Sequence, residues 1–201
     1  MNIKKIGVVG AGTMGNGIAH VFSIFNYKVV LVDINKDILE SALSVITKNM
    51  NRQVNKEIID ENTKNESISN IIFSTDMNDL SNCDLIIEAI KEDLNIKSNL
   101  FEQLDNICNK NTILASNTSS ISINKLANCT KRSEKVIGMH FMNPVPIMKL
   151  VEIIKTERTS KETLNTIIRT AINLKKDPVE CLDSPGFVSN RILIPMINEA
   201  I

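Results

Sequence analysis

His140 and Glu152 have the residue types and the placement that proton transfer requires. His140 follows the apolar run 136–139, so a strand is expected to bring its imidazole to the edge of a sheet. In the run 149–154 (KLVEII), strand alternation puts Glu152 on an aliphatic face, where an ionised carboxylate is costly unless it is paired. His140 is the first candidate for that partner, and Lys149 or an arginine is the alternative. A carboxylate bonded to one imidazole nitrogen fixes the tautomer and makes the other nitrogen a better base.

Ser119 and Asn190 are candidates for holding an oxygen atom of a substrate. Ser119 lies among other hydroxyl residues just before an expected short helix at 121–127, so it is either the N-cap of that helix or a spare hydroxyl for a ligand. Asn190 falls on the apolar face of a helix that Ser184 and Pro185 are expected to begin, as N-cap and first helical residue. Its amide either bonds to the backbone or faces a ligand.

A glycine-rich turn at 10–15 joins the apolar run 6–9 to a helical pattern. In such a turn the first glycine permits the sharp bend, the second lets a pyrophosphate approach the backbone, and the third lets helix and strand pack closely. The phosphates then bind N–H groups at the N-terminus of the helix. The expected nucleotide contacts are Gly10, Ala11, Gly12, Thr13, Met14 and Gly15.

Asp33 ends the second apolar run, 28–32. A carboxylate at this position accepts a hydrogen bond from a ribose 2'-hydroxyl and repels a 2'-phosphate, which indicates NAD rather than NADP. The alternative is a glycine-rich turn in an α/β protein that binds no nucleotide.

Apolar strand patterns alternate with helical patterns along most of the chain, which predicts a doubly wound (Rossmann), mostly parallel sheet. We expect residues 1–183 to form one NAD-binding domain. Ligands of such sheets bind beyond the carboxyl ends of the strands, so residues that follow strands are the candidates for the site. The long helix expected at 36–55 leads into a polar stretch, 57–70, that is expected to form a surface helix or loop.

Composition excludes several classes of function. Lysine plus arginine equals aspartate plus glutamate at 23 each, and there is one tyrosine and no tryptophan, so nucleic-acid binding is not expected. No apolar run is long enough to span a bilayer and no signal-peptide pattern is present, so we expect no membrane association and a cytoplasmic or equivalent reducing location. The cysteines are widely spaced and lack neighbouring histidines, so no metal site is expected: Cys83, Cys108, Cys129 and Cys181.

Four long motifs carry a resemblance to a known family: GAGTMGNGIAH, ILASNTSSISI, KVIGMHFMNPVPIMKLVEII and DSPGFVSNRILIPMINEA. They resemble the L-3-hydroxyacyl-CoA dehydrogenase family, and most of all its bacterial 3-hydroxybutyryl-CoA dehydrogenase members. The resemblance implies hydride transfer between NAD and C3 of a short-chain 3-hydroxyacyl-CoA. It implies that His140 is the catalytic acid/base, that Glu152 orients it, and that Ser119 and Asn190 hold the reacting oxygen.

The resemblance also implies cofactor contacts at Asp33, Glu92, Lys97, Ser119 and Asn143. Lys56 matches a lysine that contacts coenzyme A, and the serine that accompanies it in some relatives falls on Asn49 here. Lys48, Arg52 and Lys56 share a helix face. That face is either an ordinary solvated surface or a contact for a polyanionic substrate tail.

Relatives of this family continue into an all-helical domain that closes the substrate cleft and forms a homodimer. Residues 184–201 are expected to be the first helix of that domain, and a homodimer is expected only where the rest of it is present. Two alternatives to an acyl-CoA dehydrogenase remain at this stage. One is a truncated module that binds NAD and coenzyme A with little turnover, and the other is a Rossmann dehydrogenase that acts on hydroxyacids rather than thioesters.

Overall fold

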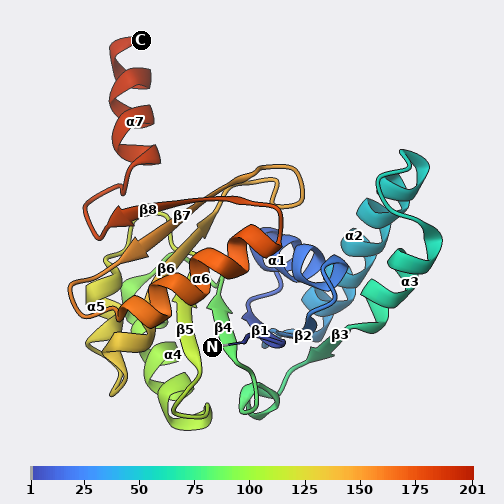
Figure 1. The fold of residues 1–201 in the computed structure, drawn as a ribbon, viewed down its shortest axis with the longest axis horizontal. Coiled ribbons are helices and arrows are strands. Elements are labelled where there is room, and N and C mark those ends of the chain that lie inside the picture. Colours follow the sequence, from blue (N-terminus) through green and yellow to red (C-terminus); the bar gives the residue numbers. More distant parts are fainter. Residues whose placement is uncertain (1) are drawn as a thin grey trace.

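The computed structural model describes residues 2–201, and their strands form a single twisted sheet (Figure 1). The 8-stranded sheet has the order β3-β2-β1-β4-β5-β6-β7-β8, and every neighbouring pair is parallel except the antiparallel pair β6 and β7. This confirms the predicted doubly wound, mostly parallel fold. The strands are β1 (Lys5–Val9), β2 (Lys28–Val32), β3 (Ile71–Ser74), β4 (Leu85–Glu88), β5 (Ile113–Ser116), β6 (Val136–Phe141), β7 (Leu150–Lys155) and β8 (Asp177–Leu182).

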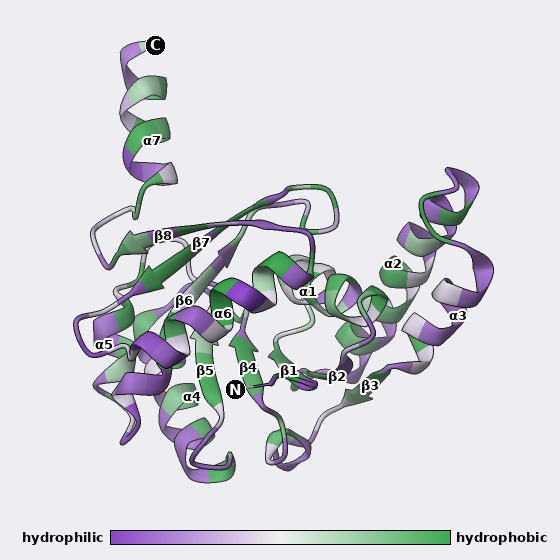
Figure 2. Ribbon diagram, in the orientation of Figure 1, coloured by the Kyte–Doolittle hydropathy of each residue, from purple (hydrophilic) through white to green (hydrophobic). Residues whose placement is uncertain are grey.

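Helices cover both faces of the sheet, because successive strand residues point to opposite sides and both sides are apolar. On β1, Val8 belongs to the core beneath α1 (Thr13–Ile24), α2 (Lys36–Asn55) and α6 (Lys161–Asn173), whereas Val9 belongs to the core beneath α4 (Leu94–Ile107) and α5 (Ile123–Ala127). Most residues of the central strands are therefore hydrophobic (Figure 2). The helices are α1 (Thr13–Ile24), α2 (Lys36–Asn55), α3 (Glu61–Ser69), α4 (Leu94–Ile107), α5 (Ile123–Ala127), α6 (Lys161–Asn173) and α7 (Ser189–Glu199).

The turn between β1 and α1 requires glycine at two of its positions. Gly10 has φ +96°, a left-handed conformation that glycine adopts without strain. A Cβ at Gly15 would lie 1.7 Å from the carbonyl oxygen of Gly10, so only a hydrogen fits there. No heavy atom lies within 4 Å of a Cβ built on Gly12, which leaves open space in front of the backbone.

The polar stretch after α2 contains the exposed helix α3. Asp60 caps this helix, because its carboxylate accepts a hydrogen bond of 2.7 Å from the backbone N–H of Thr63. The stretch is thus a surface helix, one of the two forms that its composition predicted. Among the described residues no helix is both long and apolar enough to cross a bilayer.

The last helix, α7, begins later than predicted. Ser184 is not its N-cap: the segment from Ser184 forms a turn in which Gly186 and Phe187 have positive φ values of 74° and 50°, and α7 starts at Ser189. The helix projects from the sheet (Figure 1), and its apolar side chains are exposed. The division of the chain into domains at 183/184 stays a prediction.

Candidate active site

His140 and Glu152 face each other across the antiparallel pair β6 and β7. Strand β6 continues through His140, further than predicted, and its register with β7 sets His140 opposite Glu152. His140 Nδ1 lies 2.8 Å from Glu152 Oε2, and both residues are buried. The partner that alternation suggested first is therefore the one observed, and neither Lys149 nor an arginine takes that place.

The pair has a defined charge arrangement. Burial opposes ionisation of Glu152, but hydrogen bonds from His140 and from the backbone of Ser189 and Val188 lower the pKa of its carboxyl below the usual value. An ionised carboxylate only accepts hydrogen bonds, so the proton of a neutral imidazole sits on Nδ1 and Nε2 is left as the basic nitrogen.

Glu152 has a second contact that the sequence did not indicate. Its Oε1 accepts hydrogen bonds from the backbone N–H groups of Val188 at 3.0 Å and Ser189 at 2.8 Å, at the start of α7. No side chain of α7 itself caps this end. A carboxylate at a helix N-terminus satisfies free N–H groups and is stabilised by the helix dipole.

Ser119 and Asn190 also meet at this site. Asn190 Nδ2 donates to the carbonyl oxygen of Ser119 at 3.0 Å. Ser119 is not a helix N-cap, since α5 begins at Ile123 and is capped by Ser122, whose hydroxyl accepts from the Lys125 N–H. Instead, the backbone N–H and the hydroxyl of Ser119 both lie against a carboxylate oxygen of Glu92, at 3.0 and 3.3 Å.

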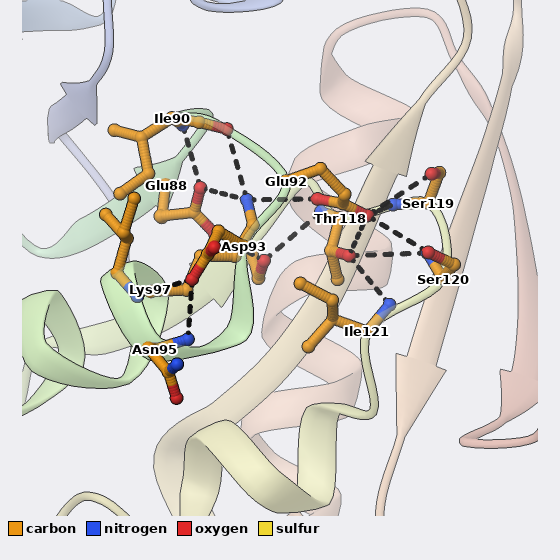
Figure 3. A network of polar contacts seen from close by, with 12 residues as sticks. Glu88, Ile90, Glu92, Asp93, Asn95, Lys97, Thr118, Ser119, Ser120 and Ile121 are labelled. Carbon is orange, nitrogen blue, oxygen red and sulfur yellow. Dashed lines mark hydrogen bonds and ion pairs between the residues drawn. The ribbon is translucent and has the colours of Figure 1, made fainter.

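His140, Ser119 and Asn190 line a pocket of about 410 Å³ beyond the ends of β4, β5 and β6, and Glu152 lies behind His140. The pocket lining includes these residues that were predicted to act in catalysis or cofactor binding: Met14, Glu92, Lys97, Ser119, His140, Asn143 and Asn190. Lys97 reaches this pocket from a buried position, 1% exposed, with its ammonium between Glu88 and Glu92 (Figure 3).

A second pocket, of about 620 Å³, borders the glycine-rich turn and Asp33. Ala89 and Ile90 line both pockets, so the two adjoin at the end of β4. Asp33 accepts a hydrogen bond of 2.8 Å from the Ala11 N–H. Sequence reasoning missed the apolar walls of this pocket, which include Ile34, Ile38 and Ile96. Ile34 is 96% exposed, and an apolar side chain directly after Asp33 was the one available signal.

Lys56 is not brought to either pocket. It is the exposed C-cap residue of α2, and neither lining includes it. Asn49, about two turns earlier on α2, accepts a hydrogen bond of 3.4 Å from Arg52.

Three of the four cysteines, Cys83, Cys108 and Cys181, are buried and do not have the surroundings of an activated thiol. All are free. Burial raises the pKa of Cys83 to about 12 and those of Cys108 and Cys181 to about 11, so these thiols stay protonated at neutral pH. Among residues 2–201, no cluster of three His, Cys, Asp or Glu side chains is placed to hold a metal ion.

Residues 5–184 match the family described as "3-hydroxyacyl-CoA dehydrogenase, NAD binding domain". This chain belongs to the 3-hydroxyacyl-CoA dehydrogenase family. It is 48% identical over 197 residues to the 3-hydroxybutyryl-CoA dehydrogenase of Clostridioides difficile, a match that covers 98% of this chain and 70% of that protein. It is 45% identical over 201 residues to a probable 3-hydroxybutyryl-CoA dehydrogenase of Bacillus subtilis, covering 100% and 70%.

Comparison with solved structures also supports membership of this family. The crystal structure of (S)-3-hydroxybutyryl-CoA dehydrogenase from Ralstonia eutropha superimposes with a TM-score of 0.97 at 44% identity, covering 99% of this chain and 70% of that one. The resemblance drawn from the four motifs is thereby confirmed, and with it NAD as the cofactor of this family of dehydrogenases. The residues present fit NAD, because the open face of Gly12, the carboxylate of Asp33 and the two adjoining pockets follow one another along the sheet edge.

Proposed function

We propose that this chain transfers a hydride between NAD and C3 of a short-chain 3-hydroxyacyl-CoA, such as 3-hydroxybutyryl-CoA. The observation that carries the proposal is the buried His140–Glu152 pair in a pocket that adjoins the nucleotide-binding turn. The names of the relatives from Clostridioides difficile and Ralstonia eutropha supply the substrate class.

In this proposal His140 moves the proton. In the oxidising direction, Nε2 removes the proton of the 3-hydroxyl group, and Glu152 stabilises the imidazolium that forms. In the reducing direction, the imidazolium returns the proton to the same oxygen. Ser119 and Asn190 hold that oxygen by hydrogen bonds while its charge changes. Bound NAD supplies the hydride acceptor, and NADH the donor.

In this proposal one pocket would hold the adenosine end of NAD and the other its nicotinamide end. The turn residues from Ala11 to Met14 and the N-terminus of α1 bind the pyrophosphate. Asp33 accepts from the adenosine ribose, with Ile34 and Ile96 against the adenine. The nicotinamide end lies in the pocket of His140. Its proposed protein contacts are Glu92, Lys97, Ser119 and Asn143.

Lys56 is proposed to contact the phosphates of coenzyme A, together with Lys48 and Arg52. Support comes from the exposure of all three cations on α2. The alternative, a solvated face with no ligand, predicts that replacing Lys56 leaves the KM for acyl-CoA unchanged.

The test is the oxidation of NADH with acetoacetyl-CoA, followed by the loss of NADH absorbance and run beside a binding measurement for NAD. We expect His140→Gln to retain NAD binding and to lower turnover by about a hundredfold or more, because a positioned general base contributes about that factor. Equal loss of binding and turnover would contradict the role of His140. Equally good saturation by free 3-hydroxybutyrate would select a dehydrogenase of free hydroxyacids.

A second candidate is a module that binds NAD and acyl-CoA but turns over slowly. The exposed apolar side chains of α7, such as Ile192 at 63% and Met196 at 60%, favour it, because such a face is usually covered in a working protein. This candidate predicts NADH binding without NADH oxidation, and recovery of oxidation when the C-terminal part of a relative is supplied. Turnover by the chain alone would exclude it.

A further inference from the structure

A buried ion pair lies behind the pocket of His140. Glu88, the last residue of β4, is 0% exposed, and Lys97, in the first turn of α4, is 1% exposed. The Lys97 ammonium has three N–H donors, and the structure gives it three acceptors: a carboxylate oxygen of Glu88, Oε2 of Glu92 at 3.2 Å, and the carbonyl oxygen of Ile90 at 3.3 Å (Figure 3). Lys97 therefore acts on the pocket through its charge and through the groups it holds.

Glu88 joins three segments at this sheet edge. Its Oε1, which also receives Lys97, accepts from the backbone N–H of Ile90 at 2.8 Å, in the loop after β4. Its Oε2 accepts from the hydroxyl of Ser116 at 2.6 Å, at the end of β5. The Ser116 oxygen accepts in turn from the N–H of Thr118 at 3.1 Å. The carboxylate thus fixes both loops that carry pocket residues.

Glu92 is the member of this cluster that reaches the pocket. Its side chain is 39% exposed, and its Oε1 accepts from the hydroxyl of Thr118 at 2.5 Å and of Ser120 at 3.3 Å (Figure 3). Burial opposes its ionisation, but the Thr118 hydrogen bond and the Lys97 ammonium lower the pKa of the Glu92 carboxyl below its usual value.

The cluster carries unbalanced charge. It holds two carboxylates and one ammonium, so one negative charge is left over beside the pocket. A gain in folding stability does not explain these buried charges, because a buried ion pair often contributes no more to the free energy of unfolding than apolar residues of similar size. The oxidised nicotinamide ring is a cation and the reduced ring is neutral. A fixed negative charge near the ring therefore stabilises one form of the cofactor and leaves the other almost unaffected, and the low dielectric of a buried site strengthens the effect.

We propose that Glu88 is a positioning residue that, together with Lys97 and Glu92, sets one negative charge at the nicotinamide end of the site and so favours binding of NAD⁺ relative to NADH. This inference rests on the proposed function, which puts the nicotinamide in the pocket of His140. Glu88 itself acts through Lys97 and through the loops it holds, without touching the ring.

The test is the ratio of the dissociation constant of NAD⁺ to that of NADH, measured for each variant by calorimetry and by nucleotide fluorescence. A ratio cancels contacts that are common to both forms of the cofactor. Glu88→Gln removes one negative charge and keeps the size of the side chain, so we expect the ratio to rise by about tenfold. Glu92→Gln removes the same charge but leaves the buried pair intact, so it changes the ratio in the same direction even if Glu88→Gln does not fold.

A double variant separates charge from packing. Glu88→Gln combined with Lys97→Met removes one charge of each sign, so the leftover negative charge returns and the ratio should return toward that of the unchanged chain. The matched control is Asp105→Asn, which disrupts the other buried ion pair of α4, with Arg132 at 2.6 Å, near the far end of the helix. This control is expected to lower stability and to leave the ratio unchanged.

An unchanged ratio in both single variants, with both nucleotides still bound, would overturn the inference and leave the proposed function standing. A ratio that stays raised in the double variant would also overturn it, since packing rather than charge would then be the cause. If the unchanged chain binds neither nucleotide, the proposed function and this inference fail together.

Discussion

Replacing Glu152 by glutamine tests the proton-transfer pair most directly. A carboxylate has two acceptor oxygens, whereas the glutamine amide has one acceptor oxygen and one NH₂ donor group, so only one side of it can still accept. If its oxygen stays with the N–H groups of Val188 and Ser189, its NH₂ faces His140 Nδ1. Nδ1 must then accept, so the imidazole proton moves to Nε2, and the nitrogen that faces the substrate can no longer act as a base.

We expect Glu152→Gln to lower turnover in the oxidising direction by about 10²- to 10⁴-fold, which is the typical effect of losing a general base or of holding it in the wrong tautomer. Folding stability also falls. Three hydrogen bonds to a buried charged acceptor are lost or become neutral, at roughly 1 kcal/mol each, which gives a decrease of about 3 kcal/mol.

The assay is NAD reduction with 3-hydroxybutyryl-CoA at saturating concentrations, with urea unfolding measured in parallel. Glu180→Gln is the matched control, because Glu180 lies on the neighbouring strand β8 and its partner Lys155 is partly exposed. We expect the control to change neither quantity. Turnover of Glu152→Gln within about threefold of the unchanged chain would refute the tautomer argument.

Four further substitutions address the cofactor turn and the helix behind it. Asp33→Ser should weaken NAD binding by about tenfold and reduce the discrimination against NADP, because the charged acceptor for the ribose is lost; equal NAD affinity by calorimetry would contradict this. Gly15→Ala should cost roughly 1–3 kcal/mol in urea unfolding, since its Cβ meets the Gly10 carbonyl, whereas Gly12→Ala should fold normally and lose NAD affinity. Burial lowers the pKa of His20 below its usual 6.5 although the hydrogen bond with Gln53 opposes this, so the unfolded chain binds the proton more readily. Stability should therefore fall as the pH drops below 6.5 toward the folded pKa, and His20→Asn should flatten this dependence in unfolding measurements.

The sequence predicted those parts of the fold and site that depend on local pattern. Apolar strands alternating with helices predicted the doubly wound sheet, and alternation in the run around Glu152 predicted its pairing with His140. The glycine spacing predicted the turn at Gly10 and Gly15. The roles of Ser119 and Asn190 stay predictions, because the structure brings them together without showing what they bind.

Features that depend on contacts between distant segments were missed or wrong. Ser184 and Pro185 have the composition of a helix start, but α7 begins at Ser189, where the carboxylate of Glu152 supplies the acceptor that a local side chain would otherwise provide. Glu88 ends an apolar strand, and nothing in its neighbours indicates that Lys97 returns to it from α4. A carboxylate within a buried strand was the available signal in that case.

The two carboxylate oxygens of Glu152 contact different parts of the molecule, the proposed base and the start of α7. One oxygen serves the imidazole, while the other receives the first N–H groups of α7. If the first turn of α7 shifts, the carboxylate loses two donors and becomes more basic, and it then holds the Nδ1 proton more tightly. A movement of the start of this helix is therefore transmitted to the proton affinity of the histidine by a single side chain, without rearrangement of strands β6 and β7.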